Sequence, residues 1–113
     1  MDDCLFCKIT AGQIPANKLY EDDQVLAFYD IDPQAPVHFL VIPKAHIASP
    51  ARITAENSAV VAHVFEVIAR LAGELDLENG YRVVTNCGAD GGQSVPHLHF
   101  HVLGRRSLAW PPG

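Results

Sequence analysis

Three histidines that alternate with apolar residues near the C-terminus limit what this chain can be more than any other feature. They are His97, His99 and His101, within the stretch QSVPHLHFHVL at positions 93–103. Because successive side chains of a β-strand point to opposite faces, a strand here places the three imidazoles on one face and the intervening apolar residues on the other. Neighbouring imidazoles on that face stand roughly 6.5 to 7 Å apart. The pattern predicts one face that packs and one face that does chemistry.

Three interpretations of this histidine face can be compared. Separately hydrogen-bonded, chemically idle histidines would be the ordinary case, but half of the 6 histidines of the chain share this one face. A catalytic zinc bound by all three would need ligand atoms spread over roughly 13 Å of strand, whereas metal–nitrogen distances are about 2 Å. The spacing therefore favours a nucleophile or general acid/base at His99, with different tasks for the outer two histidines.

The same residues resemble the signature of a known family. Positions 97–103, HLHFHVL, match the His-x-His-x-His-x-x motif, with apolar residues at x, of the histidine-triad family of nucleotide hydrolases and transferases. Further matches to the branch called histidine triad nucleotide-binding proteins are DIDPQAP at 30–36, HFLVIPK at 38–44, GGQS at 91–94 and WPPG at 110–113. The resemblance covers the chain nearly end to end. It departs from the family at Pro96, where an aromatic residue is common.

The order of strand and helix patterns predicts an α+β fold. The 113 residues fit one domain spanning 1–113. The expected elements are strands at 18–21, 24–29, 37–42, 81–86 and through the triad, a long amphipathic helix from about 55 to 77, and a short N-terminal helix or turn between 8 and 16. Strands followed by a helix and then strands indicate an antiparallel sheet of about five strands with the long helix on one face, as in the histidine-triad fold.

The composition of the chain limits the binding partners and the cellular compartment that can be expected for it. The formal net charge of −5 opposes non-specific binding to polymeric nucleic acid or to anionic membranes. The sequence shows no secretory signal and no apolar run of about 18 residues. Its 3 cysteines, an odd number, suit a reducing compartment. A cytoplasmic protein without membrane or nucleic-acid partners is therefore expected.

Cys4 and Cys7 form a C-x-x-C pair, which by itself is compatible with a chelated metal ion, a redox pair or two small buried residues. A thioredoxin-type redox pair is disfavoured because no strand precedes it. In zinc-carrying histidine-triad proteins, the pair is completed by a histidine after the Ile-Pro-Lys segment and by the first histidine of the triad. The resemblance therefore implies a structural Zn²⁺ site of Cys4, Cys7, His46 and His97. Two merely buried cysteines remain the alternative.

The resemblance also implies a nucleotide site. Asp30 is expected to accept hydrogen bonds from the ribose hydroxyls, and Ile31 to lie against a purine base. The glycine-rich loop at 88–94 is neither a P-loop nor a Rossmann turn, but its glycines permit close approach of backbone N–H groups to phosphate. Ribose or phosphate contacts are implied for Asn86, Gly92, Gln93, Ser94, His99 and His101. Trp110 is expected to reach the partner's active site in a two-fold homodimer formed through the long helix and a strand.

The implied reaction is a two-step transfer at phosphorus. Neutral imidazole is a competent nucleophile, so His99 is expected to attack the α-phosphate of a purine nucleoside phosphoramidate or related ester, after which water releases the monophosphate. His101 and Ser94 are expected to stabilise the phosphate oxygens and assist the leaving group. His38 is expected to be a further catalytic residue that supports His99. Two alternatives stay open: hydrolysis of dinucleoside polyphosphates, and a zinc-stabilised nucleotide sensor without useful turnover.

Overall fold

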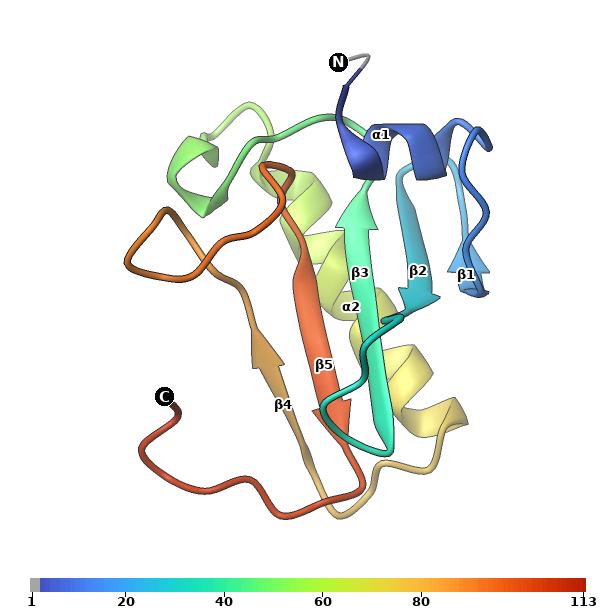
Figure 1. Cartoon of the computed structure of the whole chain (residues 1–113). Helices are drawn as coiled ribbons and strands as arrows, with labels where there is room; N and C mark the ends of the chain where they lie inside the picture. Colours follow the sequence, from blue (N-terminus) through green and yellow to red (C-terminus); the bar gives the residue numbers. More distant parts are fainter. Residues whose placement is uncertain (1–2) are drawn as a thin grey trace.

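The computed structural model describes residues 3–113, which fold around an antiparallel sheet (Figure 1). Along the chain the elements are α1 (Leu5–Thr10), β1 (Lys18–Glu21), β2 (Val25–Tyr29), β3 (Val37–Pro43), a 3₁₀ turn (Pro50–Arg52), α2 (Ser58–Glu74), β4 (Tyr81–Val84) and β5 (Phe100–Gly104). The strand order is β1-β2-β3-β5-β4, and every neighbouring pair is antiparallel. The predicted α+β fold, with its five-stranded antiparallel sheet, is confirmed.

The two faces of the sheet pack against different helices. The long helix α2 covers one face, where Leu71 and Phe39 belong to one buried cluster (Figure 1). The short helix α1 covers part of the other face, where Phe6 and Leu40 belong to a second cluster. Strand β3 serves both clusters because its side chains alternate, and it is buried along its whole length. The predicted alternation in this strand is confirmed, and it places His38 on the same face as α1.

The long helix is shorter than its apolar pattern predicted. It has 17 residues and ends at Glu74, not near residue 77. After this end Asp76 takes a left-handed conformation with φ of 58°, and the N–H of Leu77 donates to the carbonyl oxygen of Ala72 at 2.9 Å. This bond closes the helix as in a Schellman motif, and Asp tolerates the left-handed conformation better than most residues. No helix within residues 3–113, α2 included, has the length and apolarity needed to cross a bilayer.

The triad is not one continuous strand, which corrects the expectation that a strand spans all three histidines. Strand β5 begins one residue after His99, so His97 and His99 precede it and His101 lies within it. The backbone leaves the ladder because the N–H of Leu98 donates to the carbonyl oxygen of Ile47, at 2.6 Å, outside any strand. The rings of His99 and His101 still lie side by side, with centroids 5.1 Å apart.

Candidate functional site

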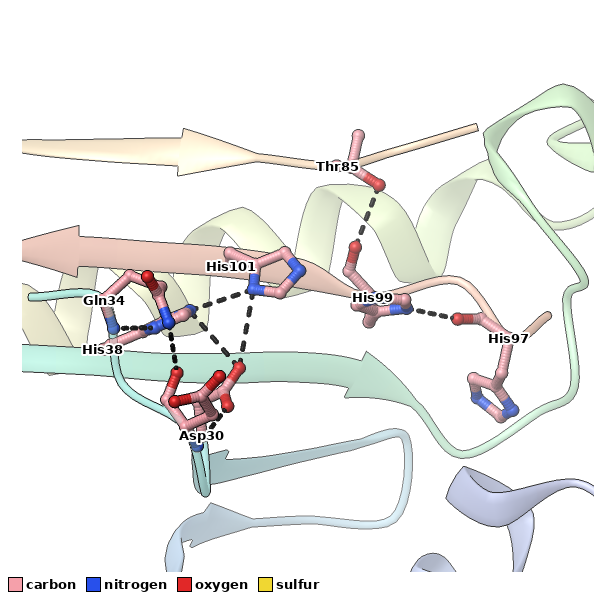
Figure 2. Close-up of polar contacts among 8 residues, drawn as sticks. Asp30, Gln34, His38, Thr85, His97, His99 and His101 are labelled. Carbon is pink, nitrogen blue, oxygen red and sulfur yellow. Dashed lines mark hydrogen bonds and ion pairs between the residues drawn. The ribbon is translucent and has the colours of Figure 1, made fainter. Parts of the chain in front are cut away.

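One ring nitrogen of His99 forms a hydrogen bond within the protein, and the other is available to a ligand. Its side chain is buried, and Nδ1 lies 2.6 Å from the carbonyl oxygen of His97 (Figure 2). Because a carbonyl oxygen can only accept, Nδ1 carries the proton of the neutral ring, and in that tautomer Nε2 has the lone pair. The ring lines a cavity of about 340 Å³, together with Asp30, Ser94 and His101. His99 can therefore meet a ligand with an unprotonated, nucleophilic nitrogen.

A chain of hydrogen bonds fixes the tautomers of two further histidines beside this cavity. The backbone N–H of Gln34 donates to Nδ1 of His38 at 3.0 Å, so the proton of neutral His38 lies on Nε2. That nitrogen lies 2.9 Å from Nδ1 of His101, which must accept and carry its own proton on Nε2 (Figure 2). His101 can therefore offer an N–H donor to a ligand.

Burial keeps both of these histidines neutral. Removal from water lowers the pKa of His38, and the nearby Asp30 partly opposes the shift. The pKa of His101 is lowered to about 4, first by burial and then by the neighbouring His99 and His38. The carboxylate of Asp30 lies 3.4 Å from Nε2 of His38 and 3.8 Å from Nδ1 of His101. At neutral pH the pair can donate hydrogen bonds without carrying positive charge.

Asp30, His38 and His101 also lie close enough to hold a metal ion, since one ligand atom of each lies within 4.8 Å of the others. The hydrogen bond from Gln34 argues against that role. A histidine that binds a metal through Nε2 normally carries its proton on Nδ1 and donates from there. Here Nδ1 of His38 accepts from an N–H, so a metal at Nε2 would leave the ring without a proton. The arrangement fits a hydrogen-bond network better than a metal site.

His38 contacts a different histidine from the one predicted. We expected it to support His99, but its ring lies against His101, with ring centroids 5.2 Å apart. The register of β3 and β5 explains the difference, because His38 lies opposite Leu103 and His101 is the next residue on that face. His99 lies before β5 begins and reaches this network through His101.

Much of the cavity wall is apolar. Ile31 is fully exposed on the loop after β2, and its side chain lines the cavity together with Ile9 and Leu40. An exposed large apolar side chain beside a cavity is a surface that a ligand can cover. The cavity therefore combines apolar walls with a few convergent polar groups, which is the pattern of a small-molecule site.

The remaining residues predicted to contact nucleotide do not all line this cavity. Ser94 does. Those outside its wall are Asn86, Gly92 and Gln93, near the loop that precedes the triad, and Trp110, on the C-terminal tail. Trp110 is 81% exposed. Nucleotide contacts by these four residues, and the role of Trp110 in a partner's site, stay predictions.

The side chain of Gln93 forms hydrogen bonds that stabilise the loop in which it lies. Its Nε2 donates to the carbonyl oxygens of Ala48 and Val95, at 2.8 and 3.0 Å. Its Oε1 accepts from the N–H of Gly88 at 3.1 Å. A phosphate contact by this amide would therefore have to replace bonds that hold the loop in place.

A second cluster joins the N-terminal cysteines to two histidines. One ligand atom from each of Cys4, Cys7, His46 and His97 lies within 4.8 Å of the others. Nδ1 of His97 lies 3.4 Å from Sγ of Cys4 and 3.6 Å from Sγ of Cys7. Nδ1 of His46 lies 3.3 Å from Sγ of Cys7. Tetrahedral coordination at the usual zinc–ligand distances would place sulfur and nitrogen about 3.6 Å apart. The four predicted residues are therefore spaced to hold one ion.

The residues around this cluster determine where its histidine and cysteine side chains carry their protons. Nε2 of His97 lies 2.8 Å from the carbonyl oxygen of Pro43, so this nitrogen carries the proton and Nδ1 is free to bind a metal. Burial lowers the pKa of His97, which favours the neutral ring that a metal requires. Burial and the adjacent Cys4 raise the pKa of the Cys7 thiol to about 11. A metal ion must therefore displace a thiol proton when it binds.

Three residues that contribute to these sites were missed by sequence reasoning. The buried ring of Phe6 lies edge-on to His99 and His97, with centroids 5.1 and 5.9 Å apart, and so connects the two sites. The hydroxyl of Thr85 donates to the carbonyl oxygen of His99 at 2.9 Å (Figure 2). Gln34 acts through its backbone N–H, which no side-chain pattern reveals. For Phe6, the one available signal was its position between the two cysteines.

Comparison with known proteins identifies the family. The family model for the HIT domain matches residues 11–108. This chain belongs to the HIT domain family. A HIT-like protein of Synechococcus elongatus, described as uncharacterized, is 53% identical over 112 residues, which are 99% of this HIT protein and 98% of the relative.

Solved structures of HIT proteins share the fold. A HIT family hydrolase from Legionella pneumophila has a TM-score of 0.96 at 48% identity, covering 98% of this chain and 100% of that chain. A histidine triad protein from Clostridium difficile has a TM-score of 0.93 at 48% identity, covering 96% of each chain. A histidine triad nucleotide-binding protein from Candida albicans has a TM-score of 0.86 at 34% identity, covering 96% and 83%. The predicted family is confirmed.

Proposed function

We propose that this HIT protein is a nucleotide-binding hydrolase that cleaves purine nucleoside phosphoramidates, or related nucleoside monophosphate esters, through a nucleotidyl-histidine at His99. The observation that carries the proposal is the bond from Nδ1 of His99 to the carbonyl oxygen of His97, which leaves Nε2 as a nucleophile in a ring that lines the cavity. The similar structures described as a HIT family hydrolase and a histidine triad nucleotide-binding protein support the broader assignment.

The first step forms one phosphorus–nitrogen bond and breaks another. The lone pair on Nε2 of His99 attacks the α-phosphorus, and the P–N bond of the phosphoramidate breaks, with its electron pair leaving on the amine, which takes up a proton. The positive charge that develops on the imidazole is stabilised by the bond from Nδ1 to the carbonyl oxygen of His97. Water then attacks phosphorus, loses a proton, and displaces Nε2, which recovers its electron pair. A nucleoside monophosphate leaves.

Neutral donors would stabilise the phosphate in both steps. His101 would donate from Nε2, and the hydroxyl of Ser94 would donate from the cavity wall. Asp30 would accept from the ribose hydroxyls, and the exposed side chain of Ile31 would be covered by the base. Hydrogen-bond donors that are already oriented cost no reorganisation during the reaction, so these groups would lower the barrier without a cation in the cavity.

For the second cluster we propose Zn²⁺, held by Cys4, Cys7, His46 and His97. Two thiolates and two imidazoles in a closed tetrahedral set are typical of structural zinc. When bound, the ion would contribute folding free energy by fixing the start of α1 against the residues before β5. The chain's own part is to supply deprotonated donors, with His97 already oriented by its bond to Pro43.

We also propose that two copies of the chain form a homodimer through α2 and a sheet strand. The large exposed aromatic residues of the described chain include Phe65 on α2, Tyr81 on β4 and Trp110 on the tail. Burial of such residues in a second subunit would remove apolar surface from water. Sedimentation of the purified protein would test this state separately from catalysis.

Release of AMP from adenosine 5′-phosphoramidate tests the proposed reaction. Wild type should turn over, and His99→Ala should lose at least about a thousandfold in rate, because the nucleophile is gone. His63→Ala is the matched control, since this histidine lies on α2 and does not line the cavity, and it should keep the wild-type rate. Circular dichroism confirms that each variant is folded.

Three other outcomes would change the proposed function or the role of His99. Turnover of dinucleoside polyphosphates without turnover of the phosphoramidate would favour the polyphosphate alternative. Nucleotide binding without turnover of either substrate, retained in His99→Ala, would favour a sensor. Equal turnover by wild type and His99→Ala would show that the central histidine is not the nucleophile.

A further inference from the structure

The loop between β2 and β3 carries the residues proposed to hold the nucleoside, yet little holds the loop itself. Residues 31–34 are exposed, and Ile31 is fully so. In the part of the chain that the structure describes, residues 31–36 receive one hydrogen bond from a residue outside the segment 30–38. Its donor is Nε of Arg106, which lies 2.9 Å from the carbonyl oxygen of Gln34. This bond is the polar tether of the loop.

Gln34 is the residue where the tether meets the histidine network. Its carbonyl oxygen accepts from Arg106, and its backbone N–H donates to Nδ1 of His38 at 3.0 Å (Figure 2). Its side-chain Nε2 also donates to the carbonyl oxygen of Asp32 at 3.0 Å, which restrains the turn. Because the accepting carbonyl and the donating N–H belong to one residue, a shift of the first displaces the second.

We propose that Arg106 is a positioning residue that anchors Gln34 and thereby holds His38 in the tautomer that leaves His101 as a donor. Arg106 lies two residues after the end of β5, the strand that contains His101, so the tether begins close in the chain to the last histidine of the network. The effect on catalysis rests on the proposed function. The effect on the tautomers of His38 and His101 does not.

An arginine suits this task for two reasons. Its guanidinium is always charged, and hydrogen bonds from charged donors are stronger than neutral ones. Its planar group also donates from Nη1 to a second carbonyl oxygen, that of Ser107, at 3.3 Å, which limits its rotation. Without the tether, the N–H of Gln34 can leave Nδ1 of His38. The ring is then free to carry its proton on Nδ1 and to accept at Nε2, which reverses the bond to His101.

Imidazole ¹⁵N shifts of labelled protein report which ring nitrogen carries the proton. In wild type at neutral pH, His38 and His101 should both be protonated on Nε2. In Arg106→Ala, His38 should show a population protonated on Nδ1, and His101 should shift with it. Arg106→Lys should restore most of the wild-type pattern, because an ammonium can still donate to one carbonyl oxygen. Unchanged tautomers in folded Arg106→Ala would overturn the proposal.

Arg105→Asn is the matched control. Arg105 is also an exposed arginine that donates to a backbone carbonyl, that of Leu75 at 2.6 Å, but it does not touch the loop. Its backbone has a φ of 66°, which Asn tolerates. This variant should keep the wild-type tautomers. A tautomer change as large as that in Arg106→Ala would show a general loosening of the strand end and would also overturn the proposal.

Kinetics then separate this inference from the proposed reaction. Arg106→Ala should lower kcat/KM for adenosine 5′-phosphoramidate roughly tenfold, with contributions from kcat through His101 and from KM through the loop, as expected for losing one hydrogen bond from a charged donor. Arg106→Lys should recover to within about threefold, as a weaker charged donor should. If wild type fails to turn over while the tautomers change as described, the proposed reaction fails and the role of Arg106 stands. If Arg106→Ala keeps the wild-type kcat and KM, Arg106 has no effect on catalysis.

Discussion

The carbonyl oxygen of His97 lies 2.6 Å from Nδ1 of His99, so the residue whose ring belongs to the Cys/His cluster also orients the central histidine of the cavity. The ring of His97 is in turn held by the carbonyl oxygen of Pro43 at 2.8 Å. A change at the cluster that moves the backbone of His97 must therefore move the proton-bearing side of His99. The two sites are coupled through one peptide group.

Loss of the proposed metal site should lower both the metal content and the stability of the protein. Cys4→Ser should reduce the metal content from near one equivalent to less than about one-tenth, because serine is a poor ligand for a soft site. Its Tm should fall by about 5 °C or more, the shift that roughly 1 kcal/mol produces in a domain of this size. Elemental analysis and thermal unfolding of protein purified without added metal give both values.

Cys87→Ser is the control for the cysteine substitution. Cys87 is exposed and lies outside the cluster, so its variant should keep the metal and the Tm of wild type. A wild-type protein with reduced thiols and less than about one-tenth equivalent of any metal would remove zinc from the account.

Thr85→Val tests how far the backbone of His99 depends on its neighbour. The variant keeps the shape of the side chain but removes the hydroxyl that donates to the carbonyl oxygen of His99 at 2.9 Å. The free energy of unfolding should fall by about 1 kcal/mol, the usual net value of such a bond, and AMP release should slow a few-fold. Thr85→Ser keeps the donor and should remain near wild type in urea unfolding and in turnover.

The pair of His63 and Asp22 predicts a pH-dependent contribution to stability. Hydrogen bonds to Asp22, at 2.6 Å, and then to Glu66 raise the pKa of His63. Burial would raise the pKa of Asp22, but hydrogen bonds from His63 and from two backbone N–H groups hold it well below its usual range. A raised histidine pKa stabilises the fold below about pH 6.5, and a lowered aspartate pKa does so above about pH 4.

His63→Ala should therefore destabilise the protein most between these limits. The loss in free energy of unfolding should be about 1 kcal/mol near pH 5.5 and should shrink toward zero near pH 9, where the histidine of wild type is neutral. Urea unfolding of both proteins at the two pH values measures it. A loss that grows with rising pH would contradict the assignment.

His101 should behave in the opposite way to His63. Its pKa is lowered to about 4, so its ring should stay neutral when the pH falls from 8 to about 5. The unfolded chain takes up a proton on this histidine below about pH 6.5, so its contribution to stability decreases as the pH falls toward 4. Proton NMR titration of the imidazole signals should show His63 protonating well before His101. Protonation of His101 above pH 6 would contradict the buried, neutral donor.

The strands and the long helix could be predicted from the sequence because they depend on side-chain patterns. Alternation in β3 predicted a strand with two packed faces, and the four residues of the Cys/His cluster followed from the resemblance to the family. The strand limits of the triad could not be predicted, because they depend on where the N–H of Leu98 finds an acceptor. The early end of α2 depends on the backbone of Asp76, and aspartate is only weakly selective for that conformation.

The histidine that forms a hydrogen bond with His38 could not be predicted from the sequence for a related reason. Its alternation in β3 gives the face correctly, but the choice between His99 and His101 depends on the register of β3 against β5. Gln34 acts through its backbone N–H, which donates to His38, and through its backbone carbonyl oxygen, which accepts from the side chain of Arg106. Every residue except proline carries both of these backbone groups. Their importance arises from the positions that the fold gives them.

The most direct test of the central claim is to trap the intermediate. Wild-type protein mixed with adenosine 5′-phosphoramidate and quenched during the first turnovers should carry one adenylyl group, and peptide mass spectrometry should locate it on His99. His63→Ala should show the same adduct, and His99→Ala should show none. An adduct on His97, on His101 or on a cysteine, or turnover by wild type with no adduct at any quench time, would contradict the account.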